Sequence, residues 1–212
     1  MVPEGVKGSV EYEHGTFDDL VFRTDPETVD RLSLRLRAAF GGGWQVRVHG
    51  RLSDAENPRP AVAAGDFADL DRVATDQSSE TWGAGLDWSS DDGKNAVGIG
   101  LDLSDFTSDI DLVLPDGSAD VSRYDLSLIT ARLHGRTEIG KVRIAGSALR
   151  LDDSGDTWPV TSWIARARIG FMVRSDVELT AFGEYWTYDE DRALRDDFDV
   201  IRYGLGFRWS FQ

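Results

Sequence analysis

The stretch VIRYGLGFRWSF, residues 200–211, carries the clearest indication of the fold class in this sequence. Its side chains alternate between a large apolar set (Ile201, Tyr203, Leu205, Phe207, Trp209 and Phe211) and a mostly small or charged set (Val200, Arg202, Gly204, Gly206, Arg208 and Ser210). Successive side chains of a β-strand point to opposite faces, so a period of two predicts a strand with one apolar face. At about ten residues, such a strand is typical of a transmembrane β-barrel, in which one face meets lipid and the other a polar lumen.

The composition agrees with this interpretation. The chain has 212 residues, and we expect residues 1–212 to form a single domain. Mean hydropathy is −0.34, and the absence of any apolar run of about 18 residues excludes a transmembrane helix. A net charge of −15 argues against a nucleic-acid partner, which would require a basic face. Glycine is abundant and cysteine absent, which predicts a β-rich fold without disulfides.

The alternating pattern recurs upstream. It covers residues 6–13, 32–38, 44–49, 82–89, 97–104, 123–128, 141–148, 163–173 and 177–186. With the terminal segment these make ten predicted strands, an even number, as in bacterial single-chain barrels. In the segment 123–128 we assign Tyr124, Leu126 and Leu128 to the apolar face, and Arg123, Asp125 and Ser127 to the polar face.

The connections between these segments alternate in length. Tight reversals are predicted at residues 41–43, 90–93 and 174–175 and around residues 135–136, because glycine and aspartate permit the backbone angles of short turns. The remaining connections are longer. All tight turns therefore lie at one end, as in outer-membrane barrels, which have short periplasmic turns and long external loops.

Alternation alone leaves open whether the apolar face points outward to lipid or inward to a soluble core. Two observations favour the outward orientation. Glycines gather on the polar face, where a crowded lumen needs them: Gly83, Gly85, Gly98, Gly100, Gly204 and Gly206. Aromatic residues lie near strand ends, as in the interfacial girdles of membrane barrels: Trp44, Trp82, Trp88, Tyr124, Trp163, Tyr185, Trp209 and Phe211.

The alternating aromatic end, comprising Tyr203, Leu205, Phe207, Trp209 and Phe211, resembles the C-terminal assembly signal of bacterial outer-membrane β-barrel proteins. Residues 81–88 and 97–103 resemble strands of Gram-negative porins. The resemblance implies an all-β, ten-stranded, antiparallel up-and-down transmembrane β-barrel in the outer membrane of a Gram-negative bacterium. It also implies partners: outer-membrane lipid, lipopolysaccharide and, during insertion, the barrel-assembly machinery. The start of the chain has no signal-peptide pattern, so a mature form is expected.

On this interpretation the polar face forms the lumen. Its predicted charged residues are Glu11, Glu13, Arg35, Arg37, Arg47, Asp87, Asp102, Asp125, Lys141, Arg143, Arg166, Arg168, Glu178, Glu184, Arg202 and Arg208. They form either an ion-pair network that fills the lumen or a charged constriction that selects solutes. A barrel of about eight strands is filled by side chains and aqueous porins have about 16, so ten strands predict a narrow or closed lumen.

We therefore expect a porin-like, passive, narrow channel for ions or small solutes. One alternative is a non-conducting structural or surface-interaction barrel, and another is a soluble β-barrel that binds an apolar ligand. The predicted external loops are acidic and could bind divalent cations; their carboxylates are Asp54, Glu56, Asp66, Asp69, Asp71, Asp76, Glu80, Asp189, Glu190, Asp191, Asp196 and Asp197.

The sequence contains no signature of an enzyme, a resident metal or a cofactor. Omptin proteases are ten-stranded outer-membrane barrels with aspartates and a histidine at the outer rim. Of the three histidines, His14 is the one placed for such a role, near Asp18 and Asp19, but no omptin-like sequence surrounds it. We expect no catalytic, cofactor-binding or metal-binding residues.

Overall fold

A computed structural model describes residues 3–16, 27–57, 71–113, 119–156, 159–190 and 197–209. These residues form one ten-stranded sheet. Its strands are β1 (Pro3–Thr16), β2 (Thr28–Phe40), β3 (Trp44–Asn57), β4 (Asp71–Ser89), β5 (Ala96–Val113), β6 (Ala119–Ile139), β7 (Val142–Gly155), β8 (Val160–Arg174), β9 (Val177–Glu190) and β10 (Phe198–Trp209). No helix in these residues is long and apolar enough to cross a membrane.

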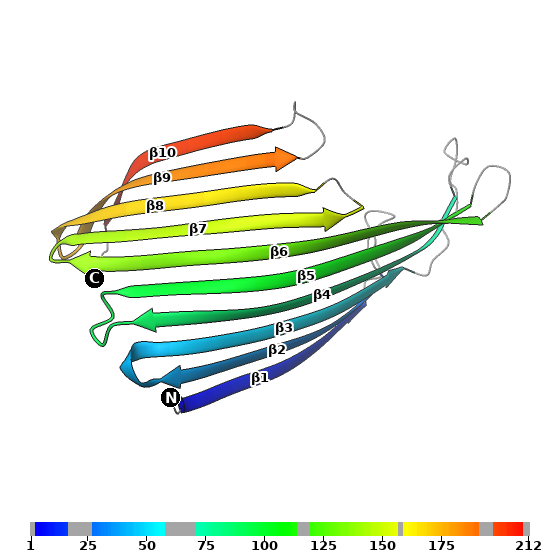
Figure 1. Cartoon of the computed structure of the whole chain (residues 1–212), viewed down its shortest axis with the longest axis horizontal. Coiled ribbons are helices and arrows are strands. Elements are labelled where there is room, and N and C mark those ends of the chain that lie inside the picture. Colours follow the sequence, from blue (N-terminus) through cyan, green and yellow to red (C-terminus); the bar gives the residue numbers. More distant parts are fainter. Residues whose placement is uncertain are drawn as a thin grey trace.

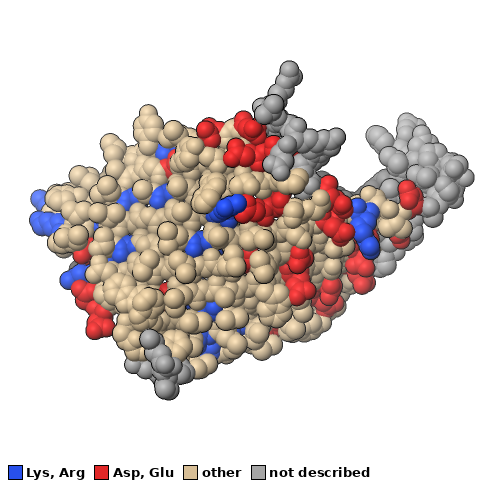
Figure 2. Space-filling model, in the orientation of Figure 1, with Lys and Arg blue, Asp and Glu red and all other residues tan. Residues whose placement is uncertain are grey.

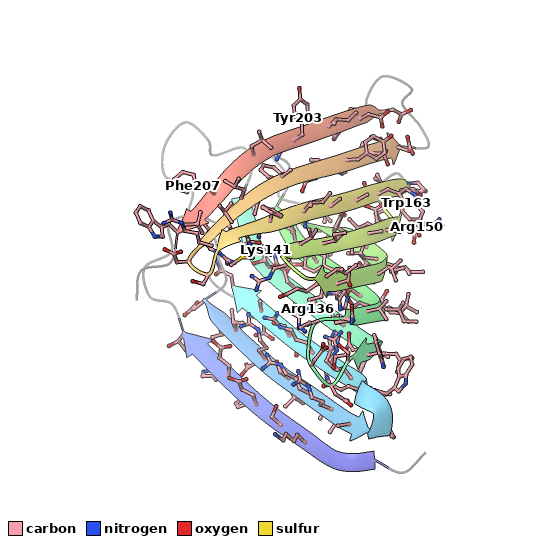
Figure 3. All side chains as sticks on the ribbon, turned by 90° about the vertical axis from the view of Figure 1, so that its left-hand side faces the viewer. Arg136, Lys141, Arg150, Trp163, Tyr203 and Phe207 are labelled. Atoms are coloured by element: carbon pink, nitrogen blue, oxygen red, sulfur yellow. The ribbon has the colours of Figure 1, made fainter. Side chains whose placement is uncertain are left out.

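Each strand pairs antiparallel with its neighbours in sequence, in the order β1 to β10 (Figure 1). The predicted up-and-down architecture is therefore confirmed. The sheet curls strongly, so that it has a convex side and a concave side when seen along its strands (Figure 3). Trp163, Tyr203 and Phe207 lie on the convex side, whereas Arg136 and Lys141 lie toward the hollow.

The convex side is apolar and exposed. Of the described residues, no hydrophobic side chain is buried, and large apolar groups such as Ile99 (53% exposed), Leu101 and Ile169 lie open. A water-soluble protein rarely exposes an apolar surface of this extent. The alternative of a soluble barrel with leucines and tryptophans packed inside does not fit this arrangement, because those side chains lie on the convex side.

The tight turns gather at one end, on the left of Figure 1, where β1 also begins and β10 ends. The turn at Gly41–Gly43 is a 3-10 turn in which Gly42 and Gly43 have φ angles of 75° and 81°. Glycine adopts this left-handed backbone without steric cost. The indole N–H of Trp88 donates to the carbonyl of Gly42 at 2.9 Å, which ties this turn to the neighbouring hairpin.

The predicted turn near residues 135–136 is wrong. β6 continues to Ile139, and the chain reverses at Gly140 and Lys141, with Gly140 at a φ of 60°. Because the strands run further than predicted, several carboxylates assigned to external loops lie in strands instead: Asp54, Glu56, Asp71, Asp76, Glu80, Asp189 and Glu190. Asp66, Asp69, Asp191 and Asp196 lie outside the described residues.

The two faces of β6 are the reverse of the prediction at its outer end. Tyr124 and Leu126 pair with Ser108 and Phe106 of β5, which share the side of Asp102. Tyr124, Leu126 and Leu128 therefore lie on the concave side, and Asp125 lies on the convex side. The polarity of the faces exchanges here because the outer ends of β5 and β6 extend past the apolar zone, where the convex side meets water.

The described residues of β1 and β10 share no backbone pairing, so closure of the sheet into a barrel stays a prediction. These two strands are the most exposed parts of the convex side, with Val10 at 70% and Leu205 at 87%. An edge strand has a neighbour on one side instead of two, which accounts for this exposure.

Candidate functional site: the charged concave side

Four carboxylates on the concave side each lie between two arginine or histidine side chains, at least one of which is an arginine. Asp87 pairs with Arg47 (2.5 Å) and His134 (3.4 Å). Asp102 pairs with Arg132 and with His49 (3.2 Å). Glu184 pairs with Arg166 (2.5 Å) and Arg202 (3.9 Å), and Glu178 with Arg208 (2.5 Å) and Arg168 (4.0 Å). We call these groups the charge triads.

The triads follow from the strand register. In two of them the partners come from the two adjacent strands, as Glu184 of β9 lies between Arg166 of β8 and Arg202 of β10. In the other two, one partner reaches across an intervening strand: His134 of β6 to Asp87 of β4, and His49 of β3 to Asp102 of β5. The side chains of Asp102 and Glu178 are only 9% and 5% exposed. A buried carboxylate is stable only when partners compensate its charge, and each triad supplies at least one arginine for this.

Glycines make the space for these triads. A Cβ atom on Gly98 would lie 2.2 Å from Oδ1 of Asp87 and 2.5 Å from Cε1 of His134. A Cβ on Gly83 would lie equally close to Asp102 and His49, and one on Gly170 to Glu178. The glycines of the polar face therefore have a specific role: they leave room for ion pairs that cross from strand to strand.

Replacing Gly98 by alanine is expected to displace the Asp87 carboxylate and destabilise the protein. Because losing a hydrogen bond to a charged group costs roughly 1.5–3 kcal/mol, the urea midpoint of unfolding in lipid vesicles should fall measurably. The matched control is Gly100→Ala on the same strand and face, where the new Cβ would meet nothing closer than the Ala84 carbonyl oxygen at 3.4 Å. Equal midpoints for the two variants would contradict the proposed role of Gly98.

A hollow lies beside the triads on the concave side of β1 to β4. Its volume is about 820 Å³, and its walls include Lys7, Arg35, Arg37, Arg47 and Arg51. A smaller hollow of about 320 Å³ lies nearer the tight turns, against Arg136, Arg143 and the Glu178 triad. Solute could occupy these spaces, since their walls are polar and hydrogen-bonding groups converge on them.

The structure places most of the predicted lumen residues on the concave side. They are Glu11, Glu13, Arg35, Arg37, Arg47, Asp87, Asp102, Arg143, Arg166, Arg168, Glu178, Glu184, Arg202 and Arg208. Lys141 lies in the turn before β7, toward the hollow (Figure 3). Asp125 is a correction, because it lies on the convex side.

Four concave residues of β6 were not predicted as lumen charges: Arg132, His134, Arg136 and Glu138. Arg132 and His134 complete two of the triads, and Glu138 pairs with Arg143 at 2.9 Å. The signal was present in the sequence, because residues 129–138 alternate with the same period of two. The predicted strand ended at residue 128, so the residues after it were not assigned to either face.

A second group of carboxylates lies on the convex side, between the exposed apolar side chains and the end of the sheet that is opposite the tight turns. Asp30, Asp54, Glu80, Asp105 and Asp109 belong to this acidic zone. Figure 2 shows acidic side chains toward the right-hand end, away from the tight turns. Arg123 donates to Asp109 at 2.7 Å, which holds the pKa of that carboxyl below its usual range.

His14, the one histidine considered for catalysis, belongs to the same convex surface. Its Nδ1 lies 2.8 Å from Oδ1 of Asp30, which also accepts a hydrogen bond from the hydroxyl of Tyr12. Asp18 and Asp19 lie outside the described residues. No group of acidic, histidine or cysteine side chains suited to a metal ion occurs within the described ranges.

Solved structures similar to this chain belong to bacterial outer-membrane proteins. No family model matches it, and no curated protein matches it. The chain resembles three solved structures: the ferric yersiniabactin uptake receptor FyuA of Yersinia pestis (10% identity, TM-score 0.47), the β domain of the Bordetella autotransporter BrkA (14%, 0.40) and outer-membrane expressed OmpT of Vibrio cholerae (11%, 0.40). These neighbours are outer-membrane β-barrels.

The similarities cover 96–97% of this chain, but they differ in the share of the other protein. This chain spans 38% of the receptor's length, against 98% of the autotransporter domain and 83% of OmpT. With TM-scores below 0.5, the three structures supply no argument about activity. The features that bear on function are the exposed apolar convex side and the charged concave side of the sheet.

Proposed function

We propose that the chain forms a membrane-spanning β-barrel of the Gram-negative outer membrane and acts as a narrow, passive channel for ions or small solutes. The observation that carries this proposal is the division of the sheet: exposed apolar side chains on the convex side, and charge triads beside open hollows on the concave side. A lipid-facing wall and an aqueous lumen require this division.

The size of the lumen follows from the number of strands. Ten strands lie near the limit at which side chains fill a barrel, so the path is expected to be narrow. The lumen is locally wider at Gly100 on the concave side of β5, where no side chain lies within 4 Å of the position that a Cβ atom would take. Transport through such a path needs neither a cofactor nor catalysis, and we propose that the protein is not an enzyme.

Planar-bilayer recordings test the channel directly. Purified protein inserted into a bilayer in 1 M KCl is expected to produce discrete conductance steps that are small compared with those of 16-stranded porins. A heat-inactivated sample of the same preparation is the control. If correctly folded, inserted protein produced no steps, the channel proposal would be overturned while the membrane barrel would stand.

A non-conducting surface barrel is the second candidate, and the acidic zone favours it. Carboxylates just outside an apolar band lie where lipopolysaccharide phosphates lie, and a divalent cation could bridge the two. In that case, removal of Mg²⁺ and Ca²⁺ by chelation should release lipopolysaccharide from the purified protein. Retention of the lipid after chelation would contradict this candidate.

A further inference from the structure

We propose that the lumen prefers anions, although the chain as a whole carries a charge of −15. The proposal rests on the channel function and names its solute class: small anions, or solutes with an anionic group. It follows from where the charges lie. Five carboxylates form the acidic zone of the convex side, and those of the charge triads already have arginine partners, whereas basic residues dominate the concave side of β1 to β3.

Basic side chains lie directly opposite one another across these strands. Lys7 of β1 pairs with Arg37 of β2, and Arg37 pairs with Arg47 of β3. Like charges on directly paired residues destabilise a sheet. Asp87 compensates Arg47 in this row, but Lys7 and Arg37 need compensation from outside the protein, and water with mobile anions is the simplest source of it.

Carboxylates within this region do not neutralise the row. Glu13 is engaged by Arg31 at 2.8 Å, and Glu11 approaches Arg35 only to 4.0 Å. Asp87 compensates Arg47. Among the described side chains, no carboxylate lies within ion-pair distance of Lys7, Arg37 or Arg51. These three are the uncompensated cations of the hollow.

The three uncompensated cations also border the larger hollow on the concave side. Lys7, Arg37 and Arg51 all border the hollow of about 820 Å³. Six lysine and arginine side chains but only two glutamates, Glu11 and Glu13, line this hollow. Such an excess of positive charge within walls of protein and lipid concentrates anions. The convex carboxylates have less influence there, because exposed charges are screened beyond about 8–10 Å at physiological salt.

The reversal potential in a KCl gradient across a planar bilayer tests the preference. We expect the sign that corresponds to chloride permeating faster than potassium. In the double variant Arg37→Gln with Arg51→Gln, the chloride-to-potassium permeability ratio should fall several-fold, because the uncompensated charge is largely removed. The matched control removes two convex arginines, Arg123→Gln with Arg150→Gln, and should leave the ratio unchanged.

The outcomes separate this inference from the channel function itself. Absence of conductance in the native protein would overturn the channel, and the selectivity with it. Conductance with a cation preference, or an equal change in both double variants, would overturn the anion preference alone. Heat-modifiable migration of each variant on a gel confirms that it is folded before it is recorded.

Discussion

Replacing Ile169 by arginine should block insertion of the protein into a membrane. Ile169 lies near the middle of β8 on the convex side, is 53% exposed, and pairs with the apolar Ile144 and Ala181. On the lipid face of a barrel, an arginine at the bilayer midplane costs about 2–4 kcal/mol. We expect the variant to accumulate unfolded, without the heat-modifiable gel migration of the native form.

The same strand offers a matched control. Ile164 lies on the concave side of β8, opposite Leu149 and Trp186. Ile164→Arg introduces the same side chain toward the lumen, where other arginines already lie, and should insert with a smaller loss. If the two variants inserted equally well or equally badly, the assignment of the lipid-facing side would be wrong.

Closure of the barrel should be demonstrable by a disulfide between β1 and β10. In lipid, each unpaired backbone group costs several kcal/mol, so open sheet edges do not occur in the hydrocarbon region. The free edges of β1 and β10 are therefore expected to pair with each other. Because the chain has no cysteine, pairs can be introduced without background.

The experiment combines Val10→Cys with a cysteine at Tyr203, Leu205 or Phe207, since all four side chains lie on the convex side. One register should place the two Cβ atoms within the 3.5–4.5 Å that a disulfide needs. Oxidation in membranes should then give a monomer that resists unfolding by heat. Val10→Cys with Leu101→Cys is the control, and disulfide-linked dimers from the seam pairs would show that the edges pair between copies instead.

The acidic zone changes how the overall charge should be interpreted. A net charge of −15 applies to the whole chain, but the concave side of β1 to β3 is basic. The effect of a charged residue on ion permeation depends on whether its side chain faces the lipid or the lumen. A prediction of ion selectivity from composition would therefore have the wrong sign if the concave arginines control permeation.

Much of the fold could be predicted from short segments of the sequence, because it depends on residues that are neighbours along the chain. The alternation of residues 97–104 or 200–209 defines a strand and its two faces, because neighbouring strand residues must point opposite ways. The tight turns at Gly41–Gly43 and near Ser175 could likewise be predicted, because glycine and short polar residues favour specific backbone angles. These features depend on adjacent residues alone.

Features that depend on pairing between strands could not be predicted from single segments of the sequence. Nothing in the neighbourhood of Asp87 indicates that it lies between Arg47 and His134, or that Gly98 makes room for it; the register of the four strands β3 to β6 brings them together. The exchange of faces at Tyr124 was missed for the same reason. Which side of a strand is polar depends on its depth relative to the apolar band, and that depth is set by the neighbouring strands rather than by the strand's own residues.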